Sequence, residues 1–231
     1  MKTAGVIGGI GPESTLEYYR LLVAGYRQRT LDGGYPSIII NSIDLKRMLD
    51  LITANQIQDM TSYLLQELER LGRAGVDFAA LAANTPHVAF DALSAQSPVP
   101  LISIVEVACA AAKARRFSRV GLLGTRFTMQ GRFYADVFGP AGIDLVVPSR
   151  DEQAYVHDKY MSELVHGVIL PETRGALSAI VRRLKEQEGI EAVILGGTEL
   201  PLILRDTDDH GLPLLDTTKL HVEEIIARLL S

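Results

Sequence analysis

The sequence predicts an α/β protein made of two lobes of similar design, each a mainly parallel sheet flanked by helices. Two observations support this prediction. Short apolar runs rich in β-branched residues alternate with amphipathic stretches along all 231 residues, and three segments of the first half have counterparts in the second half. Such alternation is typical of βαβ units, and matched halves indicate an internal duplication.

Eight strands are expected over two sheets, with amphipathic helices between them. The apolar runs that predict strands lie near residues 3–8, 36–42, 77–83, 100–103, 118–124, 143–147, 191–196 and 213–216. Helices are expected where apolar residues recur at intervals of three and four, over residues 14–30, 56–74, 130–138, 172–188 and 219–230. This order of elements supports the α/β assignment.

Three pairs of segments at a nearly constant offset support the duplication. They are residues 6–9 with 122–125, 83–86 with 197–201, and 100–103 with 213–216. Any two βα units resemble one another, but three pairs in register favour two related lobes. We expect a first lobe of residues 1–98 with 212–231, which includes the final helix, and a second lobe of residues 99–211. Ligands of such folds bind at the carboxyl ends of strands, which predicts an active-site cleft between the lobes.

Composition and charge exclude several classes of function. The 23 Lys and Arg residues against 28 Asp and Glu residues give a net charge of −5 without a long basic cluster, so a nucleic-acid partner is not expected. A single cysteine gives no internal disulfide, and the sequence has neither a signal-peptide pattern nor an apolar run of ~18 residues. We expect a cytoplasmic protein that does not enter membranes.

A glycine-rich loop, Gly8-Gly9-Ile10-Gly11-Pro12, follows the first predicted strand and precedes a helix. The backbone N–H groups of such a loop, together with the helix N-terminus, can hold an anion. The spacing differs from the G-x-G-x-x-G dinucleotide pattern and lacks the lysine of a P-loop, so nucleotide cofactors are not expected. The alternative is a tight βα turn in which Pro12 starts the helix.

Polar side chains follow two predicted strands in equivalent places. Asn84 and Thr85 come after one strand, and Thr198 and Glu199 come after its counterpart in the other lobe. Asn and Thr are common N-caps, so a purely structural role is the alternative for each loop taken alone. Their equivalent placement in both lobes favours a binding or catalytic site.

The histidines and the single cysteine give weaker evidence for a catalytic or metal site than the strand-end loops do. His87 is a candidate base or ligand donor, although a lone histidine is more often a packed or capping residue. The other histidines show no metal-ligand spacing with a cysteine or with one another, so no metal site is expected. Cys109 lies in a stretch of small residues typical of a helix, which favours a buried, unreactive thiol.

These motifs together resemble the aspartate/glutamate racemase family, in the branch of aspartate racemases and broad-specificity amino-acid racemases. The resemblance spans essentially the whole chain and rests on residues 8–12, 84–85 with His87, 123–125, and 195–196 with 198–201. Members of this family are cofactor-independent isomerases with two pseudo-symmetric α/β lobes, commonly dimerise, and bind a small amino diacid between the lobes. The resemblance therefore implies a PLP-independent racemase of amino-acid metabolism, with a small-molecule substrate, no metal and a homodimeric state.

The family mechanism uses two cysteines, one whose thiolate removes the substrate Cα proton and one whose thiol returns a proton on the opposite face. The resemblance places these cysteines at Ala83 and Gly197, whose side chains cannot carry a proton. Cys109 does not replace them, because it lies along a helix that follows a different strand. The two-thiol mechanism is therefore not possible in this sequence. A natural cysteine-free branch is favoured, with an inactive ligand-binding relative and a variant made to trap substrate as alternatives.

The residues that would hold the substrate are better retained. By resemblance, Asn84, Thr85 and Thr198 would bind the α-carboxylate and ammonium groups. Arg47, which would otherwise be interpreted as surface charge, would bind the distal carboxylate through two hydrogen bonds. The other expected substrate contacts are Gly8, Gly9, Ile10, Gly11, Thr125 and Lys159.

Proton abstraction at Cα then requires a base other than a thiolate. Glu199 is the leading candidate, followed by His87, Asp44 and Glu13. A carboxylate in this role would need a raised pKa to work near neutral pH, which burial can supply. Two alternatives to racemisation stay open: an inactive relative that binds an amino acid or diacid, and a cofactor-free lyase or decarboxylase that passes through a carbanion.

Overall fold

A computed structural model describes residues 2–30, 33–204 and 211–231 of the chain. Its described strands form two parallel four-stranded sheets of the same topology, in the orders β2-β1-β3-β4 and β6-β5-β7-β8. The first sheet contains β1 (Thr3–Gly8), β2 (Ser37–Ser42), β3 (Phe78–Leu81) and β4 (Leu101–Ile102). The second contains β5 (Arg119–Gly124), β6 (Asp144–Val146), β7 (Ala192–Gly196) and β8 (Leu214–Asp216). The predicted α/β class, with eight strands in two sheets, is confirmed.

The chain divides into two compact units, Met1–Ile104 with His221–Ser231, and Val105–Leu220. The two crossings between the units come after residues 104 and 220, later than the predicted lobe boundaries after residues 98 and 211. The reason lies in strand pairing: β4 is hydrogen-bonded to β3 in the first sheet, and β8 is hydrogen-bonded to β7 in the second. Each unit therefore completes its own fourth strand before the chain crosses.

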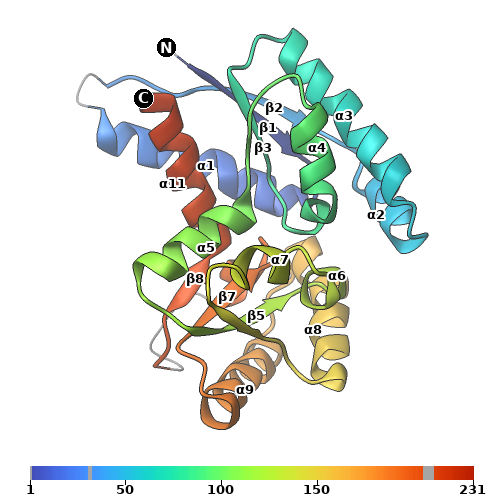
Figure 1. Ribbon diagram of the computed structural model, residues 1–231, viewed down its shortest axis with the longest axis vertical. Coiled ribbons are helices and arrows are strands. Elements are labelled where there is room, and N and C mark those ends of the chain that lie inside the picture. The colour runs from blue at the N-terminus through green and yellow to red at the C-terminus, as the bar shows by residue number, and fades with distance from the viewer. Residues whose placement is uncertain (1, 31–32, 205–210) are drawn as a thin grey trace. The chain divides into compact units, whose positions relative to one another are not determined.

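Helices cover both sides of the first sheet. They are α1 (Pro12–Arg29), α2 (Leu45–Thr53), α3 (Ile57–Arg73), the 3₁₀ turn η1 (Thr85–Ala89), α4 (Phe90–Gln96) and α11 (Thr217–Leu230). Figure 1 shows α1 and α11 on one side of this sheet and α3 and α4 on the other. Helix α1 buries Tyr18, Leu22 and Tyr26, which are spaced by four residues and form one stripe. Gly25 on the same helix allows close packing against Ile226 of α11.

The second unit contains α5 (Ile104–Ala114), α6 (Arg126–Gln130), α7 (Ala135–Phe138), α8 (Arg150–Ser162), η2 (Leu164–His166), α9 (Pro171–Glu188) and α10 (Leu200–Ile203). Its core packs α8 and α9 against β5 and β7, through side chains such as Val156, Val181 and Leu195. The single helix predicted over 130–138 is wrong. Gly131 takes an extended backbone conformation at the end of α6, and a new short helix, α7, begins at Ala135.

Among the helices that the predicted set omits, α2 and α8 begin at side-chain caps. Asp44 accepts hydrogen bonds from the backbone N–H groups of Lys46 and Arg47 at the start of α2. At the start of α8, Ser149 and Glu152 form a reciprocal capping box. Each cap satisfies backbone donors that the first turn of a helix leaves without partners.

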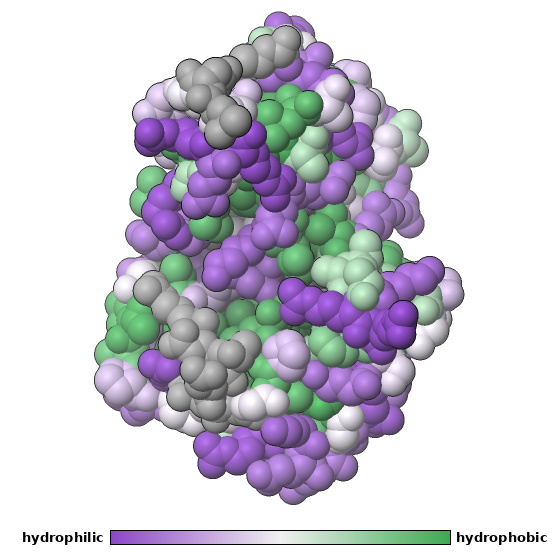
Figure 2. All heavy atoms as spheres, turned by 90° about the vertical axis from the view of Figure 1, so that its left-hand side faces the viewer, coloured by the Kyte–Doolittle hydropathy of each residue, from purple (hydrophilic) through white to green (hydrophobic). Residues whose placement is uncertain are grey.

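Apolar side chains of the strands and of the helices that flank them form the two cores, and hydrophilic groups cover much of the surface. Val6, Ile7, Val193 and Ile194 are fully buried within their sheets. On the face shown in Figure 2, hydrophilic side chains predominate and hydrophobic groups are visible between them. No helix in the described part of the chain is long and apolar enough to cross a membrane.

Candidate functional site

Most of the predicted site residues lie at the carboxyl ends of neighbouring parallel strands, as two groups, whereas Arg47 lies on α2 and Lys159 on α8. The first strand-end cluster follows β1 and β3, which pair directly, and the second follows β5 and β7, which also pair directly. The first cluster consists of Gly8, Gly9, Ile10, Gly11, Ala83, Asn84, Thr85 and His87. The second consists of Thr125, Gly197, Thr198 and Glu199. Within each unit, the structure therefore brings together residues that are far apart in sequence.

The glycine-rich loop packs closely on the segment that follows β2. Gly9 has φ +80°, and a Cβ atom there would lie 2.7 Å from the Ile43 nitrogen and 2.8 Å from Ser42 Oγ. Its own N–H donates to Oγ1 of Thr15 over 2.8 Å. Gly11, at φ +88°, is the N-cap of α1. A tight βα turn therefore explains these glycines, and the Gly9 N–H already has a partner in Thr15 of α1.

The segment after β3 is buried and held by several hydrogen bonds. The Ala82 N–H donates to the Ile7 carbonyl over 2.9 Å, and Ser14 Oγ donates to the Ala82 carbonyl over 3.1 Å. Ala83 and Asn84 are buried, while Thr85 is half-buried at the start of η1. Backbone contacts thus fix the position that the family resemblance assigns to the first cysteine.

His87 is a structural element of this segment. Its Nε2 accepts a hydrogen bond from the Ile104 N–H over 3.2 Å, so Nδ1 carries the proton and donates to the Ala83 carbonyl over 3.0 Å. Its ring stacks on Phe90 and is almost fully buried. Burial, with a smaller effect of His221, lowers the pKa of His87 to about 3. With both ring nitrogens engaged, this geometry favours a positioning role for His87 over that of a base.

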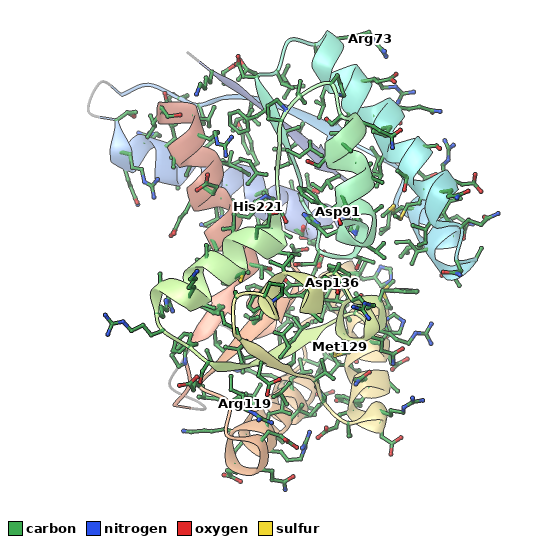
Figure 3. The ribbon with its side chains drawn as sticks, in the orientation of Figure 1. Arg73, Asp91, Arg119, Met129, Asp136 and His221 are labelled. Atoms are coloured by element: carbon green, nitrogen blue, oxygen red, sulfur yellow. The ribbon has the colours of Figure 1, made fainter. Side chains whose placement is uncertain are left out.

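His221 forms a second buried imidazole network in the same unit. Figure 3 labels it on α11. Its Nδ1 lies 2.8 Å from the Tyr18 hydroxyl, and its Nε2 lies 3.1 Å from the Ile102 carbonyl. Burial lowers its pKa to about 4, so the ring is neutral near neutral pH.

Arg47 is an exposed cation next to the end of β2. Its guanidinium stacks over the ring of Tyr63, with 4.1 Å between Cζ and the ring centroid. The Tyr63 hydroxyl in turn accepts a hydrogen bond from the Asp44 N–H over 3.3 Å. Within the part of the chain that the structure describes, Arg47 forms no ion pair. The stacked guanidinium is thus available to an anionic group.

Asp44 and Glu13, the remaining candidate bases, have other local roles. Asp44 caps α2 through its side chain, as described above. Glu13 lies in the first turn of α1, is exposed, and is favourably placed relative to the helix dipole. Both observations have a structural explanation that needs no substrate.

The second strand-end cluster begins with a capped helix. Thr125, directly after β5, accepts a hydrogen bond from the Thr128 N–H and forms the N-cap of α6. Gly124 before it is required by close strand packing, because a Cβ atom there would lie 2.6 Å from the Gly196 carbonyl oxygen. Thr125 therefore also has a structural explanation.

Glu199 is buried in a hydrogen-bonded group that includes a residue not predicted from the sequence, Tyr160. The Tyr160 hydroxyl donates a short hydrogen bond to Glu199 Oε2, and Thr198 Oγ1 donates to the same oxygen over 3.0 Å. These three side chains are almost fully buried. Burial, followed by the negative charge of Glu199, raises the pKa of Tyr160 well above its ordinary value. The phenol is therefore protonated at neutral pH.

Lys159, next to Tyr160 on α8, is paired within the protein. Its Nζ lies 2.5 Å from Glu163 Oε1, and Glu163 Oε2 accepts a hydrogen bond from Thr173 Oγ1 over 2.6 Å. The hydrogen bond to Glu163 raises the pKa of Lys159 and lowers that of Glu163. Of the two cations expected to contact substrate, Arg47 is thus the one without an internal counter-ion in the described structure.

Cys109 and the histidines form neither a reactive thiol site nor a metal site in the described part of the chain. The Cys109 side chain is buried on α5, and burial raises the pKa of its thiol. No group of three or more His, Cys, Asp or Glu residues suited to a metal ion occurs among the residues that the structure describes. His210 lies outside the described residues.

The fold and the two strand-end clusters define a two-unit α/β protein of the amino-acid racemase type. The family model described as Asp/Glu/Hydantoin racemase matches residues 7–225. The chain therefore belongs to the Asp/Glu/hydantoin racemase family, which makes it an isomerase by class.

Individual relatives agree with this assignment. The structure of an aspartate racemase homologue from Pyrococcus horikoshii is 32% identical, with TM-score 0.86 and full coverage of both chains. A candidate Asp/Glu racemase from Yersinia pestis is 28% identical, with TM-score 0.90 and full coverage of both chains. The broad-specificity amino-acid racemase RacX of Bacillus subtilis is 24% identical over 93% of this chain and 92% of its own length.

Proposed function

We propose that this protein is a cofactor-independent racemase that abstracts the Cα proton of a small acidic amino acid, aspartate or glutamate. Relatives described as an aspartate racemase homologue and as a broad-specificity amino-acid racemase support the reaction class. The observation that carries the proposal is Glu199, a buried carboxylate two residues after the position of the missing second cysteine. Because Ala83 and Gly197 have no acidic proton, the base must be a different group.

Arg47 supports an acidic substrate. Its stacked guanidinium has no counter-ion among the residues that the structure describes, and a planar guanidinium can bind a carboxylate through two parallel hydrogen bonds. Asn84, Thr85 and Thr198 are the proposed contacts of the α-carboxylate and ammonium groups, and Gly8, Gly9, Ile10, Gly11 and Thr125 complete the proposed set. We further propose a cytoplasmic homodimer, for which analytical ultracentrifugation is the direct test.

Proton NMR in deuterated buffer tests the reaction. The α-proton signals of L- and D-aspartate and of L- and D-glutamate are followed with the protein and with buffer alone. Loss of the signal above the control, followed by chiral chromatography that detects inversion, is the expected result. The Glu199→Gln variant, which keeps the shape and removes the charge, should lose exchange by about 100-fold or more.

The opposite outcomes separate the alternatives. Exchange that survives Glu199→Gln unchanged would exclude this residue as the base. A thermal shift with these amino acids but without exchange would replace the racemase by a binding protein. Turnover to a product with fewer atoms, without inversion, would replace it by a lyase.

A further inference from the structure

We propose that Tyr160 takes the place of the family's second catalytic cysteine and exchanges the proton with the substrate Cα, with Glu199 as its partner. This inference rests on the proposed function and specifies the group that meets the substrate. Neither Tyr160 nor the helix that carries it is part of the motifs on which the resemblance rests.

The steric relationship between Tyr160 and Gly197 is the first argument. A Cβ atom added at Gly197 would lie 2.9 Å from the Tyr160 hydroxyl oxygen and 3.0 Å from Cζ, with Cε2 nearer still. Gly197 is not among the residues with positive φ, so its backbone does not itself demand glycine. The tyrosine ring and a side chain at position 197 therefore exclude each other. Glycine is required here by Tyr160.

The position of the hydroxyl is the second argument. By resemblance, the second thiol is attached to the Cβ atom of residue 197, and the Tyr160 oxygen lies within 2.9 Å of that point. A substrate placed within reach of such a thiol would be within comparable reach of this hydroxyl. Tyr160 thus fills the missing side chain's space with a group that can carry a proton, which neither Gly197 nor Ala83 can do.

The hydrogen bond to Glu199 gives the phenolic proton an acceptor when Tyr160 takes up the Cα proton. In the forward step the Cα–H bond breaks, its proton passes to the Tyr160 oxygen, and the phenolic proton passes to Glu199 Oε2. The electron pair of the broken bond stays on Cα, where the adjacent carboxylate delocalises it. Return of a proton through the same two groups restores the original configuration, and inversion occurs when a proton from water reaches the opposite face of the carbanion.

This relay avoids a free phenolate. Burial and the Glu199 charge raise the pKa of Tyr160, so loss of its proton without simultaneous gain of another is unfavourable. Thr198 Oγ1 donates to the same Glu199 oxygen and holds the carboxylate in position. The first strand-end cluster has no equivalent device, because Ala83 carries no proton and both nitrogens of His87 are engaged. Exchange of the α-proton with solvent is therefore expected to be faster than inversion.

The test is Tyr160→Phe, assayed by α-proton exchange and inversion. The phenyl ring keeps the packing and removes only the hydroxyl. We expect kcat for exchange to fall by about 100-fold or more, with KM changed by less than about threefold. Tyr134→Phe is the matched control, since Tyr134 is an equally buried tyrosine of the same unit outside the cluster. It should keep wild-type kcat, and the thermal midpoints of both variants show that they fold.

The double variant distinguishes a relay from two independent structural residues. If Tyr160 and Glu199 act as one unit, Tyr160→Phe combined with Glu199→Gln should be no slower than the slower single variant. If the losses of kcat in the two single variants multiply in the double variant, or if Tyr160→Phe keeps the wild-type kcat, the inference about Tyr160 is wrong. The proposed function still holds in both cases, provided that the wild type exchanges the α-proton. A wild type without any exchange would overturn both.

Exchanging the side chains at positions 197 and 160 tests the steric argument by thermal stability. Gly197→Cys alone should lower the thermal midpoint, because its Cβ and thiol meet the Tyr160 ring. Adding Tyr160→Ala should restore most of that loss, and any exchange by this double variant should be abolished by iodoacetamide. Equal thermal midpoints for Gly197→Cys and the wild type would show that the two side chains do not compete for space, against the inference.

Discussion

Tyr18 donates a hydrogen bond from its hydroxyl to Nδ1 of His221 over 2.8 Å and so joins α1 to α11, which are remote in sequence. The direction of this bond follows from the other ring nitrogen. Nε2 lies 3.1 Å from the carbonyl oxygen of Ile102, which can only accept, so Nε2 carries the proton and Nδ1 is the acceptor. The first unit therefore holds His221 in its neutral form.

Because of this histidine, the free energy of unfolding should decrease as the pH is lowered. In the unfolded chain an ordinary histidine binds a proton below pH ~6.5, whereas burial delays protonation of folded His221 to a pKa of about 4. The unfolded state thus binds more protons in this window, and the stabilisation present above the unfolded pKa is lost as pH falls toward the folded pKa. We expect His221→Gln to lower the thermal midpoint at pH 7 and to flatten its decline between pH 7 and 4.

The His221→Gln variant should change the free energy of unfolding by a measurable amount. A shift of this size corresponds to about 3 kcal/mol of stability over the window. His166→Gln is the control, since His166 is exposed in η2 and should leave the slope unchanged. Scanning calorimetry at several pH values measures both. A His221→Gln slope equal to that of the wild type would contradict the assignment of a buried neutral imidazole.

Substituting three glycines by alanine distinguishes the stability cost of a steric clash from the cost of a positive φ angle. Gly9→Ala combines φ +80° with close approach to Ile43 and Ser42 and should cost more than about 3 kcal/mol. Gly75→Ala, at φ +85° with open space around it, should cost only about 1 kcal/mol of strain. Gly175→Ala, in open space within α9, should stabilise by about 0.5 to 1 kcal/mol.

Urea unfolding of the three variants measures this order. If Gly9→Ala proves no worse than Gly75→Ala, close packing between the glycine-rich loop and the end of β2 is not what requires Gly9. The anion-binding alternative for that glycine would then regain support. A Gly175→Ala variant that destabilises would indicate an unrecognised contact at α9.

The strands of both sheets could be predicted because short stretches of sequence are enough to identify them. Buried parallel strands read as continuous apolar runs bounded by breaks in pattern, and the duplication supplied an independent check on their order. The first turn of α8 also carried a local signal: Ser149 and Glu152 have the S-x-x-E spacing of a capping box. The amphipathic pattern of α8 is weak because most of its residues are polar, which explains its omission.

The candidate site was predictable only at the strand ends. Asn84, Thr198 and Glu199 follow strands directly, so topology alone places them with their neighbours. The contact of Tyr160 with Gly197 joins positions on different elements and depends on how α8 packs against β7, which no local pattern records. Likewise, nothing in the sequence near His87 shows that Ile104 and Ala83 occupy both of its nitrogens.

Thiol reagents should not inhibit this enzyme. Cys109 is the only cysteine of the chain, is buried on α5, and has a thiol pKa raised by burial, so little thiolate is present at neutral pH. Incubation with iodoacetamide should leave α-proton exchange unchanged, and Cys109→Ser should keep wild-type kcat. Rapid inactivation of the wild type that is absent from Cys109→Ser would instead assign the thiol a catalytic role.

Arg47 should determine preference for an acidic side chain. Removing a charge-assisted hydrogen bond of this kind costs about 1.5 to 3 kcal/mol, so Arg47→Ala should raise KM for aspartate by about 10- to 100-fold with kcat nearly unchanged. Lys46→Ala is the matched control, because Lys46 is the neighbouring exposed cation and is paired with Asp50. Exchange of alanine, which lacks a distal carboxylate, should respond equally little to both variants. Arg47→Lys should be intermediate for aspartate, since lysine keeps the charge but loses the planar two-pronged geometry. A KM for aspartate that is unchanged in Arg47→Ala would mean that stacking on Tyr63 is the whole role of this guanidinium.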